Sequence, residues 1–257
     1  PSADGTTIAL QPGVIGAAAN RRLAPFARKI GPDPASIDAA MIGGIAANNA
    51  SGMCCGTAQN SYRTLAAMRV VLVDGAVLDT ADPASVAAFR ASHADLLSSL
   101  GALAHETKGN TVLADRIRHK FRIKNTTGYS LNALVDYDDP VDILIHLLIG
   151  SEGTLGFISD ITYHTVVEHP CKASALVVFD DLESACKVVT LLSAAPVAAV
   201  ELMDRAALRS VEQKPGMPEN IGALGPDGAA LLIETRAETA VGLEAQIRSV
   251  TDLLGAI

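Results

Sequence analysis

The residues best suited to chemistry lie in four polar turns that contain glycine. They are GPDP at 31–34, IGGIAANNASGMCCG at 42–56, KNTTGY at 124–129 and GSEGTLG at 150–156. Glycine lets the backbone approach a ligand closely, and asparagine offers a donor and an acceptor without charge. Exposed backbone N–H groups in such turns bind anionic or polar oxygens. Together the turns favour a large, flat, partly anionic ligand that lies along the backbone.

Several common catalytic patterns are missing from the sequence. It holds no GxGxxG after the first expected strand, no GxxxxGK[ST] and no GxSxG, so Rossmann, P-loop and α/β-hydrolase sites receive no support. Without an acid–base set of its own, the pattern favours a bound redox cofactor that brings the reactivity. We predict no catalytic residue within these 257 residues.

The cysteines and histidines predict no metal site. Cysteines 54, 55, 171 and 186 show neither a CxxC pair nor zinc spacing, and His164 and His169 are typical of structural positions. Nothing basic beside Cys54 and Cys55 would lower the pKa of either thiol, so we interpret both as small buried packing residues rather than reactive thiols. Unpaired thiols indicate a reducing compartment.

Composition excludes several classes of protein. The chain has 49% apolar and 19% charged residues and a net charge of −8, which argues against disorder and against a nucleic-acid partner. No apolar run reaches the roughly 18 residues of a membrane span, and no signal peptide is visible. We therefore expect a cytoplasmic protein, or one peripheral at the inner membrane. The basic stretch RIRHKFRIK at 116–124 is interpreted as the solvated face of an amphipathic element.

Hydrophobic periodicity and turn residues predict the elements that position these turns. Before Pro170 we expect a strand at 6–11, a helix at 14–26 and a short helix that Ser36 caps. A hairpin at 68–80 that turns at Asp74–Gly75, a long helical region at 82–122 and a final strand after 156 follow. After Pro170 strands and helices alternate, with strands at 173–179, 197–203 and 229–235 and helices at 182–194, 204–211 and 238–254. The fold class is α+β, with a domain boundary near Pro170.

Six motifs in this order resemble the FAD-linked oxidases of the vanillyl-alcohol oxidase/PCMH superfamily, and most of all the D-lactate, glycolate and D-2-hydroxyglutarate dehydrogenase branch. They are QPGV at 11–14, GPDPAS at 31–36, IGGIAANNASG at 42–52, VVLVDGAVLDT at 70–80, NTTGYSL at 125–131 and IGSEGTLGFISD at 149–160. The resemblance covers about residues 6–165. It implies the second half of a PCMH-type FAD-binding domain over 1–170, followed by the first part of a ferredoxin-like α/β cap domain over 171–257.

The resemblance also implies parts that these residues do not supply. Relatives have a glycine-rich loop for the FAD pyrophosphate earlier in the chain, and substrate-binding residues, often with a metal, in and beyond the second half of the cap. We therefore expect an internal fragment that is inactive alone. The segment NNASGMCCG at 48–56 and the HPCKAS junction at 169–174 are similar to the corresponding segments of long bacterial proteins that append an iron–sulfur domain.

The cofactor contacts are carried over from the family motifs to matching positions. Pro32 and Asp33 lie beside the flavin in this interpretation, Gly43 and Gly44 run against the cofactor, and a third segment lies near the isoalloxazine ring: Asn48, Ala50, Ser51 and Gly52. Ser51 stands where relatives commonly have glycine and adds a hydroxyl donor. The adenosine half is assigned to Glu152, Gly153, Gly156 and Ile158, with Phe157 as an apolar wall. Thr127 and Tyr129 are assigned as structural neighbours of the site.

The activity implied by the resemblance is the oxidation of a D-2-hydroxy acid such as D-lactate or glycolate. A hydride would pass from C2 of the substrate to flavin N5, a base outside the chain would take the hydroxyl proton, and electrons would leave to a quinone, a cytochrome or an iron–sulfur domain. Two alternatives remain open. One is a non-catalytic flavin-scaffold module, and the other is an FAD enzyme of the same fold with another substrate class, for example a relative of the alkyl-phosphate synthases or aryl-alcohol oxidases.

Overall fold

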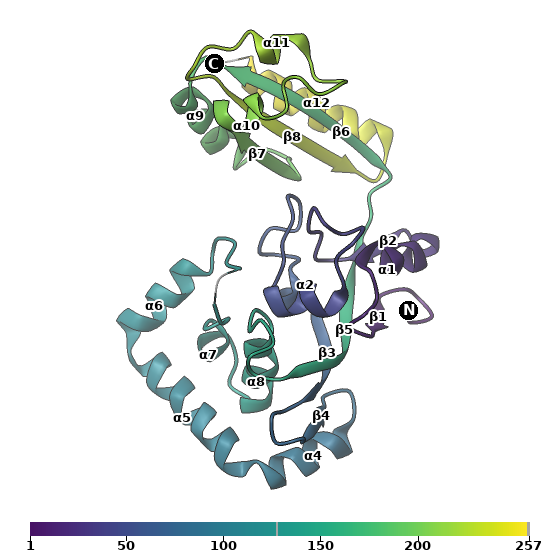
Figure 1. The fold of residues 1–257 in the computed structure, drawn as a ribbon, viewed down its shortest axis with the longest axis vertical. Helices are drawn as coiled ribbons and strands as arrows, with labels where there is room; N and C mark the ends of the chain where they lie inside the picture. Colours follow the sequence, from purple (N-terminus) through teal and green to yellow (C-terminus); the bar gives the residue numbers. More distant parts are fainter. Residues whose placement is uncertain (127, 256–257) are drawn as a thin grey trace. The chain divides into compact units, whose positions relative to one another are not determined.

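The computed structural model of this protein describes residues 1–126 and 128–255 (Figure 1). The chain forms two compact units, Pro1–Glu168 and His169–Ile257. The division lies close to the boundary expected at Pro170. Each unit combines helices with an antiparallel sheet, as the α+β prediction requires.

The sheet of the first unit is organised around one long strand, β5 (Phe157–Val167). β5 pairs antiparallel with β1 (Thr7–Leu10), β2 (Arg28–Ile30) and β3 (Leu65–Val71), and β3 also pairs with β4 (Val77–Asp79). Ile158, Ile161 and Tyr163 of β5 are buried in the core. The β3–β4 hairpin turns at Gly75 with a φ of +85°, the left-handed conformation that glycine adopts without cost. This hairpin was predicted and is confirmed.

Nine helical segments complete the described part of the first unit. They are α1 (Gly16–Leu23), the 3₁₀ helix η1 (Ala24–Phe26), α2 (Ile42–Asn48), α3 (Ser61–Thr64), α4 (Pro83–Ser92), α5 (Ala94–Gly109), α6 (Thr111–Lys120), α7 (Ala133–Asp136) and α8 (Pro140–Leu148). The helical region expected at 82–122 is interrupted at His93 and Asn110. Asp82, Asn110 and Asp139 cap the helices that follow them through their side-chain oxygens. α5 packs against α7 and α8.

The helix expected to start from Ser36 begins later, so that prediction was wrong. Residues 35–39 form a separate turn in which the Ser36 carbonyl accepts hydrogen bonds from the N–H groups of Ala39 and Ala40. Met41 then pairs with Ile15 in an extended conformation, with φ −82° and ψ 147°. Because this extended residue is held by a tertiary bridge, α2 can begin only at Ile42.

The second unit has a three-stranded antiparallel sheet with helices on both faces. Its order is β6 (Cys171–Phe179), β8 (Ala229–Ala237) and β7 (Ala199–Met203). Alternate residues of β8 point to opposite sides, because side chains alternate along a strand. Leu231 and Ile233 pack toward α9 (Leu182–Leu192) and α12 (Ala240–Leu254), and Ala230 packs with α10 (Arg205–Arg209) and the short α11 (Glu219–Gly222). Within the described residues, no helix is both long enough and apolar enough to cross a membrane.

Candidate functional site

Glycine-rich segments from both ends of the first unit meet around an open cavity of about 330 Å³. Six of the predicted cofactor residues line it: Gly43, Gly44, Glu152, Gly153, Gly156 and Ile158. Pro12, Ala47 and Phe157 complete the lining. The fold therefore brings together α2, the turn at 150–156 and the start of β5, as a common ligand site for these motifs requires.

The wall formed by α2 is held in place through its last carbonyl groups. The N–H groups of Gly150 and Glu152 donate to the carbonyls of Ala46 and Ala47 at 3.1 and 2.9 Å. The last turn of a helix leaves carbonyls without intrahelical partners, and here the turn from the other motif supplies the donors. The helix ends at Asn49, which adopts the left-handed conformation with φ 50°.

Glu152 is fixed at the rim of the cavity by an unusual backbone and by a side-chain partner. Its φ is +53°, a conformation that costs a residue with a side chain about 1–2 kcal/mol. The Asn48 carboxamide donates from Nδ2 to Glu152 Oε1 at 2.6 Å. A glycine would adopt this positive φ at a lower cost. The contribution specific to Glu152 is therefore its side chain, which accepts the hydrogen bond from Asn48.

The glycines of the cavity fall into two groups by what surrounds them. A Cβ at Gly44 or Gly153 would have no heavy atom within 4 Å and would project into open space. A Cβ at Gly43 would lie 2.7 Å from Pro12 Cβ, and one at Gly156 would lie 3.0 Å from Val70 Cγ2. Gly43 and Gly156 thus permit close packing, whereas Gly44 and Gly153 leave backbone accessible from the cavity.

One apolar side chain stands exposed at the mouth of the cavity. Phe157 is 61% exposed although it is aromatic, while Ile158 beside it is 7% exposed. Phe157 begins β5 opposite Val71 of β3, so its backbone is held by the sheet while its ring remains accessible. This position fits the apolar wall expected from the sequence.

Six other predicted residues do not line this cavity: Pro32, Asp33, Asn48, Ala50, Ser51 and Gly52. Pro32 is buried, and Asp33 holds two loops together because its Oδ1 accepts from the N–H groups of Gly52 and Cys55, both at 3.1 Å. A Cβ at Gly52 would lie 1.7 Å from the Asp33 carbonyl oxygen, so glycine is required there. Ser51 Oγ donates to the Gly56 carbonyl at 3.2 Å.

Ala50 packs against the main core from a half-buried position. The segment from Asn48 to Gly52 therefore divides, with Asn48 at the cavity rim and its later residues among the loops. Contacts of these six residues with a cofactor stay predictions.

The residues flanking the site behave as packing and bracing groups. Cys55 is 1% exposed, and burial raises the pKa of its thiol, which makes it a poor nucleophile. Cys54 is half-buried. The hydroxyl of Tyr129 lies 2.9 Å from Thr154 Oγ1 and so braces the turn beside the cavity. Thr127 lies outside the described residues.

Sequence reasoning missed two lining residues. Pro12 belongs to the QPGV motif, and its carbonyl accepts from Gly43 N–H at 2.9 Å. Ala47 follows Gly43 and Gly44 at the helical spacing of four and three residues, which places all three on one face of α2. That spacing could have identified Ala47, whereas the contact of Pro12 depends on tertiary structure.

Comparison with known families decides the identity of the fold. The FAD binding domain family matches residues 2–81, and the C-terminal domain of the FAD linked oxidases matches residues 168–257. The chain belongs to the FAD-linked oxidase superfamily. Its cofactor is FAD, and the predicted α+β PCMH-type fold is confirmed.

The relatives that this chain matches are longer than the chain itself. D-2-hydroxyglutarate dehydrogenase of Haemophilus influenzae is 25% identical over 215 residues, which cover 80% of this chain and 20% of that protein. Alkyldihydroxyacetonephosphate synthase, solved in P1 and in P212121, is 15% identical with a TM-score of 0.61. The two structures cover 99% and 98% of this chain and 39% and 38% of theirs. At this identity they show the fold alone.

The cavity residues of this chain fit part of such a cofactor. Gly44 and Gly153 leave room for a ligand against bare backbone, and Phe157 offers an exposed aromatic ring. Glu152 is the one charged side chain among the lining residues, which the structure describes in full. The lining therefore suits a polar, uncharged portion of FAD better than its pyrophosphate.

Proposed function

We propose that this chain supplies part of the FAD site of an oxidoreductase that oxidises a D-2-hydroxy acid, such as D-lactate or glycolate. Its electrons pass to a quinone, a cytochrome or an iron–sulfur acceptor. Similarity to D-2-hydroxyglutarate dehydrogenase supports this substrate class. Because the chain spans about a fifth of that relative, the activity of the whole protein is part of the proposal.

The observation that carries the proposal is the cavity between α2 and the turn at 150–156. Gly44 and Gly153 present backbone to the ligand, and the Asn48–Glu152 hydrogen bond holds the rim. We assign these residues to an uncharged portion of the cofactor, and Phe157 to an apolar contact that excludes water from it. When bound, FAD supplies the redox chemistry by accepting the hydride from C2 of the hydroxy acid.

The chain's own residues bind and orient in this scheme, and they do not move the substrate proton. Glu152 is the one titratable group of the fully described lining, and its carboxylate already accepts a hydrogen bond from Asn48. A base must lie within hydrogen-bond reach of the proton it removes. We therefore assign proton removal to a group outside this cavity.

Binding of FAD by the whole gene product that carries this sequence tests the cavity directly. After incubation with FAD and removal of free cofactor, that protein should retain visible flavin absorbance, and Gly44→Leu should abolish it because the new side chain fills the cavity. Gly109→Leu is the matched control, since Gly109 is also an exposed helical glycine with nothing within 4 Å of a Cβ. Equal retention by both variants would place the cofactor elsewhere.

The substrate class is tested on the whole gene product that carries this sequence. D-2-hydroxyglutarate, D-lactate and glycolate are each added under anaerobic conditions, and bleaching of bound flavin is followed by absorbance. We expect at least one of them to bleach it and to support reduction of a dye acceptor. Bound flavin that none of them bleaches would contradict the hydroxy-acid assignment while leaving the FAD site intact.

A further inference from the structure

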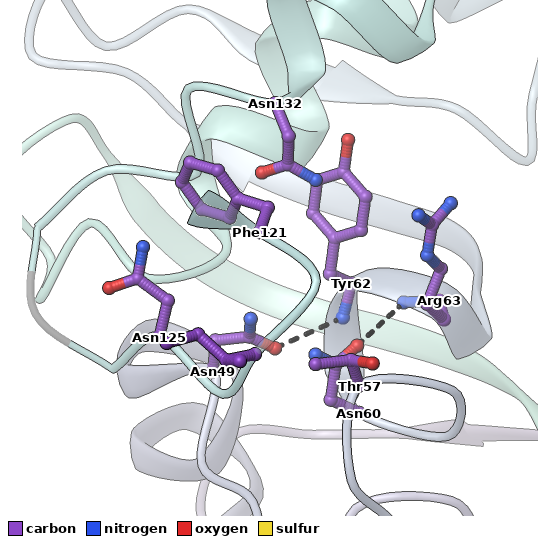
Figure 2. Close-up of a pocket in the computed structure, with 9 residues that line it drawn as sticks. Asn49, Thr57, Asn60, Tyr62, Arg63, Phe121, Asn125 and Asn132 are labelled. Atoms are coloured by element: carbon purple, nitrogen blue, oxygen red, sulfur yellow. Dashed lines mark hydrogen bonds between the residues drawn. The ribbon is translucent and has the colours of Figure 1, made fainter. Parts of the chain in front are cut away.

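A second cavity of the first unit has a different character from the first. It measures about 440 Å³, and its lining includes Arg63 of α3, Arg118 of α6, Phe121 and Arg122 after α6, and Asn132 and Asp136 at α7. It adjoins a smaller cavity of about 20 Å³ that shares Arg63, Phe121 and Asn132 (Figure 2). No lining residue is common to these cavities and the proposed FAD cavity.

The lining of the second cavity is positively charged in a chain whose net charge is −8. Arg63 lies 3.7 Å from Asp136, and Arg118 forms an exposed pair with Asp115 at 3.0 Å. Arg122 contacts His119 and forms no ion pair with a carboxylate among the described residues. Three guanidinium groups thus face one lining carboxylate, and a concave surface with an excess of one charge concentrates ions of opposite sign.

Asn132 adds a specific requirement to this charge. The side chain is 5% exposed, and its Nδ2 donates to Asp136 Oδ2 at 3.1 Å, which fixes the direction of the carboxamide. Its Oδ1 is buried and accepts no hydrogen bond from any described residue. Figure 2 shows this oxygen turned toward the Phe121 side of the cavity. A buried acceptor without a donor is unfavourable. A ligand that places an O–H or N–H group at this point would remove that cost.

The surroundings of Asn132 give it a rigid position. Asp136 Oδ2 also accepts from the Tyr62 hydroxyl at 3.0 Å. Tyr62 N–H donates to Asn49 Oδ1 at 3.2 Å, and Figure 2 shows this bond. The Arg63 guanidinium lies over the Tyr62 ring at 5.4 Å from its centroid. These contacts hold an acceptor and a cation beside one cavity, and preorganised groups bind a ligand at lower entropic cost.

We propose that this cavity binds a small oxyanion that also carries an O–H donor, either a hydroxycarboxylate or hydrogen phosphate. The anionic oxygens pair with the arginine guanidinium groups, and the O–H group donates to Asn132 Oδ1. The volume is within the usual range for small-molecule sites, about 300–1,000 Å³. This site does not depend on the proposed FAD function, because the two cavities share no lining residue.

Matched pairs of anions test the proposal by calorimetry on the purified chain at constant ionic strength. Malate differs from succinate by one hydroxyl, and hydrogen phosphate differs from sulfate by its O–H donor at neutral pH. We expect malate or hydrogen phosphate to bind with a Kd of about 1 mM or tighter and about three- to tenfold more tightly than its partner. Tighter binding of malate than of succinate would identify a hydroxycarboxylate site, and tighter binding of hydrogen phosphate than of sulfate would identify a phosphate site.

Variants separate the site from general charge effects. Arg118→Gln and Arg122→Gln should each weaken binding about three- to tenfold, whereas Arg116→Gln, on the same exposed helix but outside the lining, should change it less than about twofold. Asn132→Leu should remove the preference for malate over succinate, and if it fails to fold the arginine variants still decide. Absence of binding by every probe, equal binding within both pairs, or equal weakening by Arg116→Gln would overturn the proposal.

Discussion

Adjacent glycines at 43 and 44 should respond in opposite directions to the same substitution. Both lie inside α2, where alanine is favoured over glycine by about 1 kcal/mol. A Cβ at Gly44 meets nothing within 4 Å, so Gly44→Ala should raise the free energy of unfolding by about 0.5–1 kcal/mol.

Gly43→Ala meets a different environment. Its Cβ would lie 2.7 Å from Pro12 Cβ and 3.4 Å from Pro12 Cα and O. These atoms cannot rotate away, since they belong to a proline ring and to backbone, and the Gly43 N–H bond to the Pro12 carbonyl holds the segments together. Overpacking of this kind costs about 1–3 kcal/mol. After subtracting the gain in helix propensity, we expect a net loss of about 0–2 kcal/mol.

Tyrosine fluorescence during urea unfolding measures this difference in stability, because it reports on the unit that contains both glycines. The chain has no Trp, and all four tyrosines, at 62, 129, 137 and 163, lie in the first unit. With equal m-values, the unfolding midpoint of Gly44→Ala should exceed that of Gly43→Ala. If both variants lose equal stability, the assignment of Gly44 to open space is refuted, and with it the main support for the cofactor cavity.

Three further predictions use the same measurement. Gly52→Ala should lose about 3 kcal/mol or more, because its Cβ would overlap the Asp33 carbonyl oxygen; a loss below about 1 kcal/mol would contradict that packing. Glu152→Gly should leave the free energy of unfolding about unchanged, because relief of the left-handed strain offsets the lost hydrogen bond with Asn48. Glu152→Ala keeps the strain and should lose about 1 kcal/mol. A glycine variant less stable than the alanine variant would be inconsistent with this account. Burial lowers the pKa of His146, so below about pH 6.5 the unfolded state binds a proton that the folded state does not bind, and stability should fall as pH drops toward the folded pKa. His146→Phe should reduce this dependence of stability on pH. An unchanged dependence would assign the effect to other groups.

Local pattern was sufficient to predict most elements of this fold. The β3–β4 hairpin followed from Asp74–Gly75, and the helices near 83–120 and 240–254 followed from their hydrophobic pattern. The Ser36 cap failed because the bridge between Met41 and Ile15 keeps Met41 extended. No local signal in Ser36 reveals a partner on another segment.

The candidate site was predicted in part, for the same physical reason. Resemblance of motifs identified Gly44 and Gly153, and the structure brings both to one cavity. Pro12 was missed because only tertiary contact joins it to α2. Arg118 and Arg122 were interpreted as a solvated face, which their alternation with buried Ile117 supports, but periodicity within α6 cannot show that Asn132 lies across a cavity from them.

The pairing of β5 has a consequence for how the chain is made. This strand ends at Val167, yet it is the partner of β1, β2 and β3, the first of which begins at Thr7. At a synthesis rate of about 5–20 residues per second, the edge of β1 waits about 10–30 seconds for its partner. The first unit therefore folds late and as a whole, with a high contact order, and an expression boundary placed before Phe157 would remove the strand on which its sheet is built.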